Sequence, residues 1–262
     1  MITSLSNPRV KQVVLWQSKA KERKKDQVFL VEGVKMYEEA PESNIKETYI
    51  LEETLEKVKG TPVADKLRRT GYETVSRDVF LKMSDTQTPQ GILCVVKRPQ
   101  FDLEQLLQAE NPLFVVLEDL QDPGNLGTIV RTGEGAGVTA VLMSKNTVDI
   151  YNPKTIRATM GSIYRVPHIY IEDMGELLGK LHNAGVKTYA AHLQGENYYN
   201  SFSFTEPTAF LIGNEGNGLK KETADMAKYY LKIPMEGQVE SLNAAIATSL
   251  LMYETHRQRS IN

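Results

Sequence analysis

From residue 113 to residue 257, short apolar runs alternate with stretches whose apolar residues recur at helical spacing. This alternation predicts strand–helix–strand units, which build a mostly parallel sheet with helices on both faces. The apolar runs are residues 113–117, 140–143, 166–171, 188–192, 209–212 and 229–233. The helical stretches are residues 126–134, 153–160, 174–184, 220–227 and 244–257. Ligands of such sheets bind outside the carboxyl ends of the strands.

The first hundred residues predict a smaller α/β unit. It begins with a helix over residues 8–25, capped by Asn7 with Pro8 at its first position. Short strands and helices then alternate: strands at 28–31, 47–51, 73–75 and 91–96, and helices at 34–39, 63–69 and 78–83. The sequence Lys97-Arg98-Pro99-Gln100 interrupts this pattern, and a short helix follows over 101–109. We therefore expect two domains, residues 1–105 and residues 106–262.

Composition is that of an ordinary globular protein, with 41% hydrophobic and 24% charged residues. No apolar run approaches the roughly 20 residues that cross a bilayer, and the start of the chain lacks a signal-peptide pattern. We therefore expect a cytoplasmic protein that does not enter a membrane. The single cysteine, Cys94, lies within an apolar run and is expected in the core.

The four histidines show neither metal-ligand spacing nor a Ser-His-Asp arrangement, so no metal site is expected and they are interpreted as structural or exposed. They are His168, His182, His192 and His256.

Basic residues gather at the N-terminus, although the net charge of the chain is −2. Residues 1–25 hold seven lysines and arginines against the single acidic residue Glu22. Such an arm is suited to contact with a phosphate backbone. On the charge run alone, a solvated helix face is the favoured alternative. Trp16 within this arm is either a base-stacking residue or the anchor that packs the helix down.

Three polar segments rich in glycine follow or end apolar runs. We name them motif 1 (residues 122–132, DPGNLGTIVRT), motif 2 (residues 211–219, LIGNEGNGL) and motif 3 (residues 233–247, IPMEGQVESLNAAIA). Glycine lets a ligand approach the backbone closely, so a pocket for a polar cofactor is predicted where they meet. Motif 2 lacks both the GxGxxG spacing and a Walker lysine, which argues against a dinucleotide or nucleoside triphosphate.

Each motif also has a purely structural interpretation. In motif 2, the glycines could serve tight turns. In motif 1, Asn125 could cap a helix that runs through Arg131. In motif 3, Ser241 or Asn243 could cap the alanine-rich helix that follows. Capping accounts for the hydroxyl and amide side chains, but it does not account for the loop of residues 233–240.

Taken together and in this order, the three motifs resemble those of the SpoU (TrmH) family of RNA ribose 2′-O-methyltransferases, within the SPOUT superfamily. The resemblance covers residues 113–255. It implies a deep trefoil knot, S-adenosyl-L-methionine as cofactor, and a homodimer in which Asn125 and Arg131 of one protomer complete the pocket of the other. More loosely, residues 29–33 and 88–92 resemble the ribosomal-protein-like RNA-binding domain often attached to these enzymes.

The resemblance also implies which residues form the site. The catalytic residues would be Asn125, Arg131, Ser241 and Asn243, and the cofactor contacts would be Leu211, Gly213, Glu215, Ile233, Ser241 and Leu242. A guanidinium with a pKa above about 12 is a poor general base, so electrostatic support of the 2′-oxygen is the safer role for Arg131. Acting as the base would require unusual desolvation or help from an RNA phosphate.

The segment of residues 151–162 resembles the part of the family that follows the second strand. Within it, Arg157 and Ser162 are candidate RNA or dimer contacts, with a capped surface helix as the favoured alternative.

The function that the resemblance implies is transfer of a methyl group from S-adenosyl-L-methionine to a ribose 2′-hydroxyl in RNA, without a metal. A separate N-terminal RNA-binding domain favours ribosomal RNA as the substrate. Two alternatives remain open: methylation of transfer RNA, and a non-catalytic factor for RNA binding or ribosome assembly.

Overall fold

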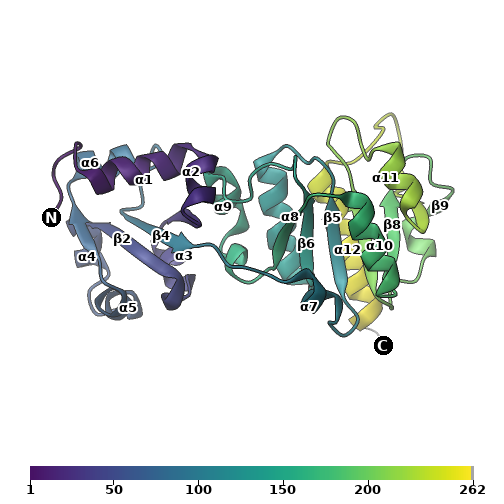
Figure 1. The fold of residues 1–262 in the computed structure, drawn as a ribbon, viewed down its shortest axis with the longest axis horizontal. Helices are drawn as coiled ribbons and strands as arrows, with labels where there is room; N and C mark the ends of the chain where they lie inside the picture. The colour runs from purple at the N-terminus through teal and green to yellow at the C-terminus, as the bar shows by residue number, and fades with distance from the viewer. Residues whose placement is uncertain (261–262) are drawn as a thin grey trace. The chain divides into compact units, whose positions relative to one another are not determined.

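The computed structural model describes residues 1–260, which form two compact units, each with its own sheet (Figure 1). Unit 1 comprises residues 1–100 and 151–164, and unit 2 comprises residues 101–150 and 165–260. The segment of residues 151–164 contains helix α9 (Pro153–Thr159). It joins unit 1 through a tilted contact between the rings of Tyr151 and Phe29, whose centroids are 4.9 Å apart.

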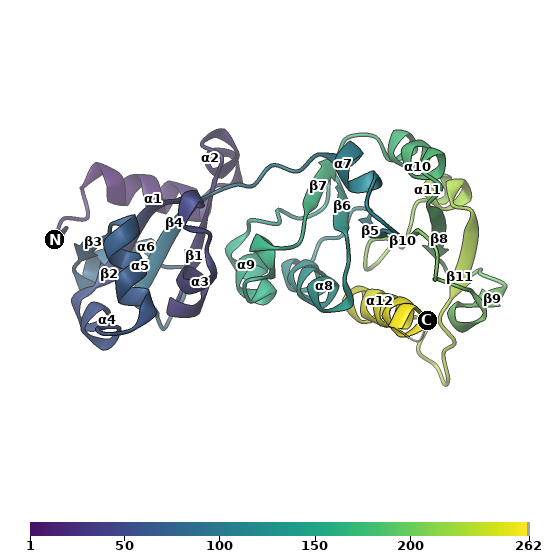
Figure 2. The same ribbon diagram turned by 90° about the horizontal axis from the view of Figure 1, so that it is seen from below.

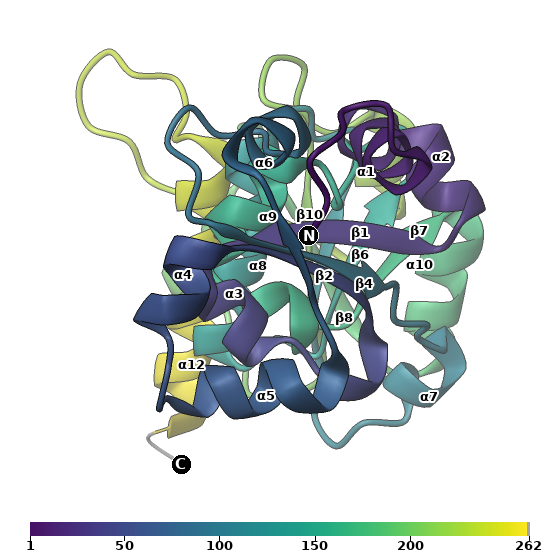
Figure 3. The same cartoon turned by 90° about the vertical axis from the view of Figure 1, so that its left-hand side faces the viewer.

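Unit 1 is built on a four-stranded sheet in the order β1 (Val28–Glu32), β4 (Ile92–Lys97), β2 (Ile45–Leu51) and β3 (Glu73–Val75). The β1–β4 and β4–β2 pairs are antiparallel, whereas β2 and β3 are parallel. Helices α1 (Pro8–Ser18), α2 (Ala20–Lys25) and α6 (Arg77–Met83) lie on one side of this sheet, and α3 (Val34–Glu39) and α5 (Pro62–Thr70) on the other (Figure 3). Helix α4 (Glu52–Lys57) follows β2 and was not predicted from the sequence.

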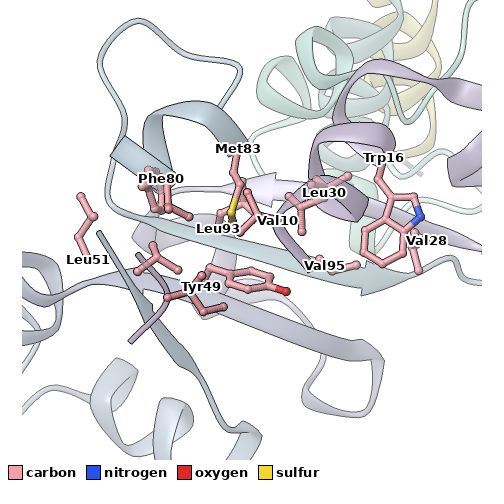
Figure 4. Close-up of a cluster of buried hydrophobic side chains, with 14 residues drawn as sticks. Val10, Trp16, Val28, Leu30, Tyr49, Leu51, Phe80, Met83, Leu93 and Val95 are labelled. Carbon is pink, nitrogen blue, oxygen red and sulfur yellow. The ribbon is translucent and has the colours of Figure 1, made fainter. Parts of the chain in front are cut away.

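One hydrophobic cluster of unit 1 lies between its sheet and the helices α1 and α6. Val10 and Trp16 of α1 and Phe80 of α6 pack against Leu30 and Val95 of the sheet (Figure 4). The prediction that Cys94 lies in the core is confirmed, and its burial raises the pKa of the thiol to about 12. A thiol with so high a pKa stays protonated, so Cys94 acts as a small apolar side chain.

The prediction of one helix over residues 8–25 is wrong, because the chain breaks into α1 and α2 at Lys19, which has an extended backbone (φ −125°, ψ 109°). Arg23 of α2 folds back and donates from Nη1 to the carbonyl oxygens of Trp16 at 2.7 Å and Gln17 at 3.2 Å. These carbonyls belong to the last turn of α1, where intrahelical partners run out. A side chain therefore replaces the missing helical hydrogen bonds.

The same arrangement decides the role of two residues of the basic arm. Arg23 is only 3% exposed, so it is not available to a phosphate. Trp16 is 4% exposed and donates from its indole nitrogen to Asp26 at 2.7 Å. Of the two interpretations of Trp16, the anchor is therefore confirmed and the stacking residue is wrong. The cap on α1, Asn7, is confirmed, since its side chain accepts from the backbone N–H of Arg9.

Unit 2 is built on a parallel sheet of seven described strands in the order β7-β6-β5-β10-β8-β11-β9. Their bounds are β5 (Leu113–Leu117), β6 (Ala140–Ser144), β7 (His168–Ile171), β8 (Lys187–Ala191), β9 (Asn197–Tyr198), β10 (Thr208–Ile212) and β11 (Tyr229–Lys232). The prediction of a mostly parallel sheet is confirmed, and the two-residue strand β9 is an addition to it. The threaded knot that the resemblance implies stays a prediction.

Helices cover both faces of this sheet, as the alternating pattern predicts. Helices α8 (Pro123–Ala136) and α12 (Ala244–Ser260) pack side by side on one face (Figure 2). On the other face lie α7 (Leu103–Leu107), α10 (Met174–Asn183) and α11 (Lys221–Met226). No helix within residues 1–260 is long and apolar enough to cross a membrane. Because the strands are parallel, the segments that leave β5, β8, β10 and β11 emerge at one edge of the sheet.

Candidate active site

A cavity of about 640 Å³ opens at the carboxyl ends of β8, β10 and β11. Its walls are formed by residues 191–194 after β8, by residues 212–219, which are nearly all of motif 2, and by much of motif 3, including Ile233, Ser241, Leu242 and Asn243. A volume within about 300–1,000 Å³ is usual for small-molecule sites. The cavity therefore lies where ligands of parallel sheets are expected, and motifs 2 and 3 form its walls.

Motif 2 forms a closed loop whose backbone faces this cavity. The backbone N–H of Asn214 donates to the carbonyl of Gly218 at 3.1 Å, and the N–H of Gly218 donates back at 2.9 Å. A Cβ at position 213 would lie 2.0 Å from the carbonyl carbon of Gly218, so only glycine fits there. Gly218 itself has φ +69°, which favours glycine for a different reason. Gly213 serves close approach and Gly218 serves the turn.

Motif 3 enters helix α12 through Asn243. The Asn243 side-chain oxygen accepts from the backbone N–H groups of Ala245 at 2.9 Å and Ile246 at 3.3 Å, which is N-cap geometry. Asn243, rather than Ser241, is therefore the cap. The Ser241 side chain is exposed, lines the cavity and makes no hydrogen bond to a residue of the described chain. A hydroxyl in that position remains able to bind a polar ligand.

Asn125 of motif 1 joins the other two motifs. Its side-chain nitrogen donates to Glu215 at 3.0 Å, and its side-chain oxygen accepts from Asn243 at 3.0 Å. The prediction that Asn125 caps α8 is wrong, because the helix begins earlier, at Pro123, and Asp122 is its cap. This shift frees the Asn125 amide for the two contacts. All three motifs are therefore connected by side-chain hydrogen bonds within one chain.

Glu215 holds the loop that precedes α8. Its two carboxylate oxygens accept from the backbone N–H groups of Gln121 at 3.0 Å and Asp122 at 2.9 Å, besides Asn125. Partial burial raises the pKa of Glu215, but these hydrogen bonds outweigh it, so the pKa lies below its ordinary value and the group is ionised at neutral pH. Glu215 lines the cavity, and its carboxylate positions motif 1.

Three residues of the implied site do not line the cavity: Asn125, Leu211 and Arg131. Leu211 is fully buried in β10 and packs in the apolar cluster under α10 and α11. Arg131 lies on α8 with an exposed side chain, and it makes no hydrogen bond or ion pair with any residue among 1–260. The Arg131 guanidinium is therefore free to bind a group that comes from outside this chain.

Sequence reasoning missed a buried carboxylate that anchors motif 2. Glu118, directly after β5, is 2% exposed, and it accepts from the backbone N–H of Lys220 at 2.9 Å and the Thr223 hydroxyl at 2.6 Å. Its neighbour Asp119 has φ +56°, and the carbonyl oxygen of Asp119 accepts from the side chain of Asn214 at 2.9 Å. The two residues thus fix both ends of the motif 2 loop. An acidic pair directly after an apolar strand was the available signal.

The interpretation of the histidines needs one addition, because His192 lines the cavity and stacks edge-on against Tyr230. No group of three or more histidine, cysteine, aspartate or glutamate side chains within residues 1–260 could hold a metal ion.

Ser162 and Arg157 fit the structural interpretation of their segment. Ser162 is buried, so it is not a surface contact, and Arg157 of the Asn152-capped helix α9 pairs with Asp85 at 2.8 Å.

Two family models match the chain. Residues 112–253 match the SpoU rRNA Methylase family, and residues 7–94 match the MRM3-like substrate binding domain. The first match contains all three motifs.

Relatives and solved structures are similar over nearly the whole chain. The 23S rRNA (guanosine(2553)-2′-O)-methyltransferase RlmP of Bacillus subtilis is 35% identical, over 96% of this chain and 97% of its own. An AdoMet-bound rRNA methyltransferase from Sinorhizobium meliloti superimposes with a TM-score of 0.87 at 31% identity, over 98% of this chain and 97% of that one. The SpoU methyltransferase AviRb from Streptomyces viridochromogenes, in complex with the cofactor AdoMet, gives 0.85 at 28% identity, over 97% and 98%.

Proposed function

Because this chain belongs to the SpoU rRNA methylase family, we propose that it transfers the methyl group of S-adenosyl-L-methionine to a ribose 2′-hydroxyl in ribosomal RNA. The observation that carries the proposal is that two motifs line one cavity and the third is hydrogen-bonded to both of them. Asn125 contacts Glu215 of motif 2 and Asn243 of motif 3, and motifs 2 and 3 line the cavity. Those contacts join residues 90 and 118 positions apart in the sequence.

The walls of the cavity fit a cofactor that combines polar and apolar groups. The folded-back loop at Gly213 exposes backbone groups, Ser241 offers a free hydroxyl, and Ile233 and Leu242 supply apolar surface. When bound, S-adenosyl-L-methionine supplies a methyl group on a sulfonium, which a 2′-oxygen attacks in line. We propose Gly213, Glu215, Ile233, Ser241 and Leu242 as its contacts. Leu211, which is buried in β10, would support these residues through packing.

Arg131 is proposed to bind the RNA at the reacting ribose. A guanidinium group donates hydrogen bonds and has no acceptor, so Arg131 stabilises negative charge on the 2′-oxygen or an adjacent phosphate. Asn125 and Asn243 hold their amides in fixed orientations because each also bonds to a second group. In the transfer, the 2′-oxygen would gain the methyl group, the cofactor would leave as the neutral thioether, and the hydroxyl proton would pass to solvent water.

We further propose that the chain is a homodimer and that Arg131 acts on the pocket of the partner. Arg131 has no partner within its own described chain and does not line its own chain's cavity. Helix α12, beside α8, exposes Ile246 (55%) and Tyr253 (49%), which lie seven residues apart on one helix face. A second copy packed on this face would bury both side chains.

Ribosomal RNA is preferred over transfer RNA because the chain carries a substrate-binding domain in addition to the methylase domain. The free Ser241 hydroxyl and the intact hydrogen-bonded network of Asn125, Glu215 and Asn243 favour an active enzyme over a non-catalytic RNA factor. With RNA as its substrate, the protein is proposed to act in the cytoplasm.

The first test is calorimetric titration of the whole chain with S-adenosyl-L-methionine, with ATP and NAD as controls. Selective binding that is lost in the double variant Ser241→Ala/Asn243→Ala supports the cofactor site. The second measurement is transfer of a radiolabelled methyl group to protein-free 23S rRNA, with the product mapped by its resistance to alkaline cleavage at the 2′-O-methylated position. Binding without transfer to any RNA would favour the non-catalytic factor.

A further inference from the structure

The basic side chains of unit 1 differ in their surroundings. Many are neutralised by a nearby carboxylate or are buried, and others are exposed without an ion pair. Ion pairs join Arg9 to Glu73, Lys35 to Glu39, Lys59 to Glu56, Arg68 to Asp65, Arg69 to Glu42, Arg77 to Glu53 and Arg157 to Asp85. Six lysines at one end of the sheet are exposed and make no ion pair within residues 1–260. We call them the basic edge: Lys19, Lys21, Lys24, Lys25, Lys46 and Lys97.

Four lysines of the basic edge come from the arm and two come from the sheet. The burial of Arg23 turns one side of α2 inward, which leaves Lys21, Lys24 and Lys25 on its outer side. The backbone N–H of Arg98, the residue after Lys97, donates to the carbonyl of Gln27 at 2.9 Å, so the end of β4 adjoins the end of α2.

Strand register places Lys97 on the same side of the sheet as α1 and α2. Lys97 pairs with Val28 at the start of β1. Val95, two residues earlier on β4, packs into the cluster beneath α1, close to Trp16 (Figure 4). Because side chains of a strand alternate between faces, Lys97 points to the same side as Val95. It lies just beyond the last buried position.

A bulge in β2 brings Lys46 to the same place. Ile45 pairs with Val96 and Glu47 pairs with Val95, which leaves Lys46 as the extra residue of the pair. Bulges redirect side chains in this way. The Lys46 amine lies 5.1 Å from the centre of the Trp16 ring, and Trp16 in turn bonds to Asp26 at the end of α2.

The acidic residues near the basic edge do not neutralise it. Asp26, the C-cap of α2, accepts from Trp16 at 2.7 Å and from Gln12 at 3.2 Å, and Glu22 is the one carboxylate within α2. Glu47, next to Lys46, pairs with Arg9 at 3.6 Å. Six ammonium groups without an ion pair outnumber these three carboxylates and give a concentrated positive field. Lysine ammonium groups on flexible stems suit the phosphates of a nucleic-acid backbone, which they bind without reading sequence.

From this geometry we infer that the basic edge binds the phosphate backbone of the substrate RNA. The inference rests on the proposed function for the identity of the RNA. It departs from the linear arm that the sequence suggests, because Arg9, Lys11 and Arg23 are left out and Lys46 and Lys97 are added. Those two lysines lie far from the arm in sequence, so substituting them distinguishes the basic edge from the linear arm.

The experiment compares two double variants of the full chain that remove equal charge. Lys46→Gln/Lys97→Gln removes two lysines of the basic edge, and Lys57→Gln/Lys82→Gln removes two exposed lysines of unit 1, on α4 and α6, that also lack an ion pair within residues 1–260. Binding to protein-free 23S rRNA is measured by filter retention across a series of KCl concentrations. For two lost phosphate contacts, the slope of log Kobs against log[KCl] should flatten by about 1.4–1.8, at about 0.7–0.9 per contact.

The basic edge is supported if only the Lys46→Gln/Lys97→Gln variant flattens the slope. Equal slopes in that variant and the wild type, or equal flattening in both variants, would overturn it. Titration with S-adenosyl-L-methionine and methyl transfer are measured on the same proteins. If the wild type transfers methyl groups and the basic-edge variant keeps the wild-type slope, RNA binding by the basic edge is contradicted and the proposed function stands. If the wild type binds RNA through the basic edge but does not bind the cofactor, the proposed function is contradicted and the basic edge stands.

Discussion

At the scale of single residues, the site depends on polar groups whose partners are far away in the sequence. Asn125 bonds to Glu215 and Asn243, and Glu118 bonds to Lys220 and Thr223. In each case a side chain after one strand fixes a segment that follows another. The resemblance identified Asn125, Glu215 and Asn243 as site residues, but their contacts with one another become visible only in the fold.

Glu118 is expected to act as a positioning residue for the cofactor loop. Glu118→Ala leaves the Lys220 N–H and the Thr223 hydroxyl without their partner, at a cost of about 1–3 kcal/mol. We expect the dissociation constant for S-adenosyl-L-methionine to rise about tenfold, equivalent to about 1.4 kcal/mol. Glu118→Gln should restore binding, because an amide can accept from the N–H and donate to the hydroxyl.

The control for this prediction is Glu222→Ala, which removes an exposed carboxylate from α11, the helix that carries Thr223. Calorimetry gives the dissociation constant, and thermal unfolding gives the stability of each variant. If Glu118→Ala lowers the melting temperature but binds the cofactor as the wild type does, Glu118 supports the fold and does not position the loop.

At the scale of elements, the N-terminal helices illustrate how a local pattern misleads. Residues 8–25 have helical composition throughout, yet the chain turns at Lys19 because Arg23 satisfies the end of α1 and Trp16 is buried against the sheet. Helix propensity is local, whereas the gain from these contacts comes from packing. The same packing changes the phosphate-binding surface from a linear arm into an edge that includes β2 and β4.

Arg23→Ala is expected to destabilise unit 1. It removes the donors to Trp16 and Gln17 at the end of α1, which should cost roughly 1–3 kcal/mol. Trp16 is the single tryptophan of the sequence, so its fluorescence during urea unfolding of the whole chain reports on this unit. The neighbouring exposed residue provides the control: Lys24→Ala should change stability by less than about 0.5 kcal/mol. Equal effects from both substitutions would contradict the capping role of Arg23.

At the scale of the whole molecule, the proposed dimer predicts that two defective chains can complement each other. Arg131→Ala alone should lower methyl transfer about 100- to 1,000-fold, as expected for one electrostatic contact to the transition state, while cofactor binding is unchanged. The double variant Ser241→Ala/Asn243→Ala should be inactive because its cavity no longer binds the cofactor. If Arg131 acts across the dimer, a mixed dimer has one complete site, formed by the intact cavity of one chain and the intact Arg131 of the other.

The mixed dimer is obtained by co-expressing the two variants with different tags and purifying through both. Recovered methyl transfer in this species supports the arrangement, with each variant purified alone as the control. Activity no higher than that of the separate variants would mean that Arg131 serves its own chain. Failure to recover any doubly tagged protein would contradict the homodimer.

The sequence by itself determined most of the strands and helices, the parallel sheet of unit 2 and the three motifs, because periodicity, caps and turn residues are local properties. It also indicated the edge of the sheet at which a ligand binds, since parallel strands end together. Only the tertiary structure decided that Asp122 rather than Asn125 caps α8, that Arg23 is buried, and that Glu118 anchors motif 2. Each depends on a partner brought close by folding, and local spacing carries no information about such distances.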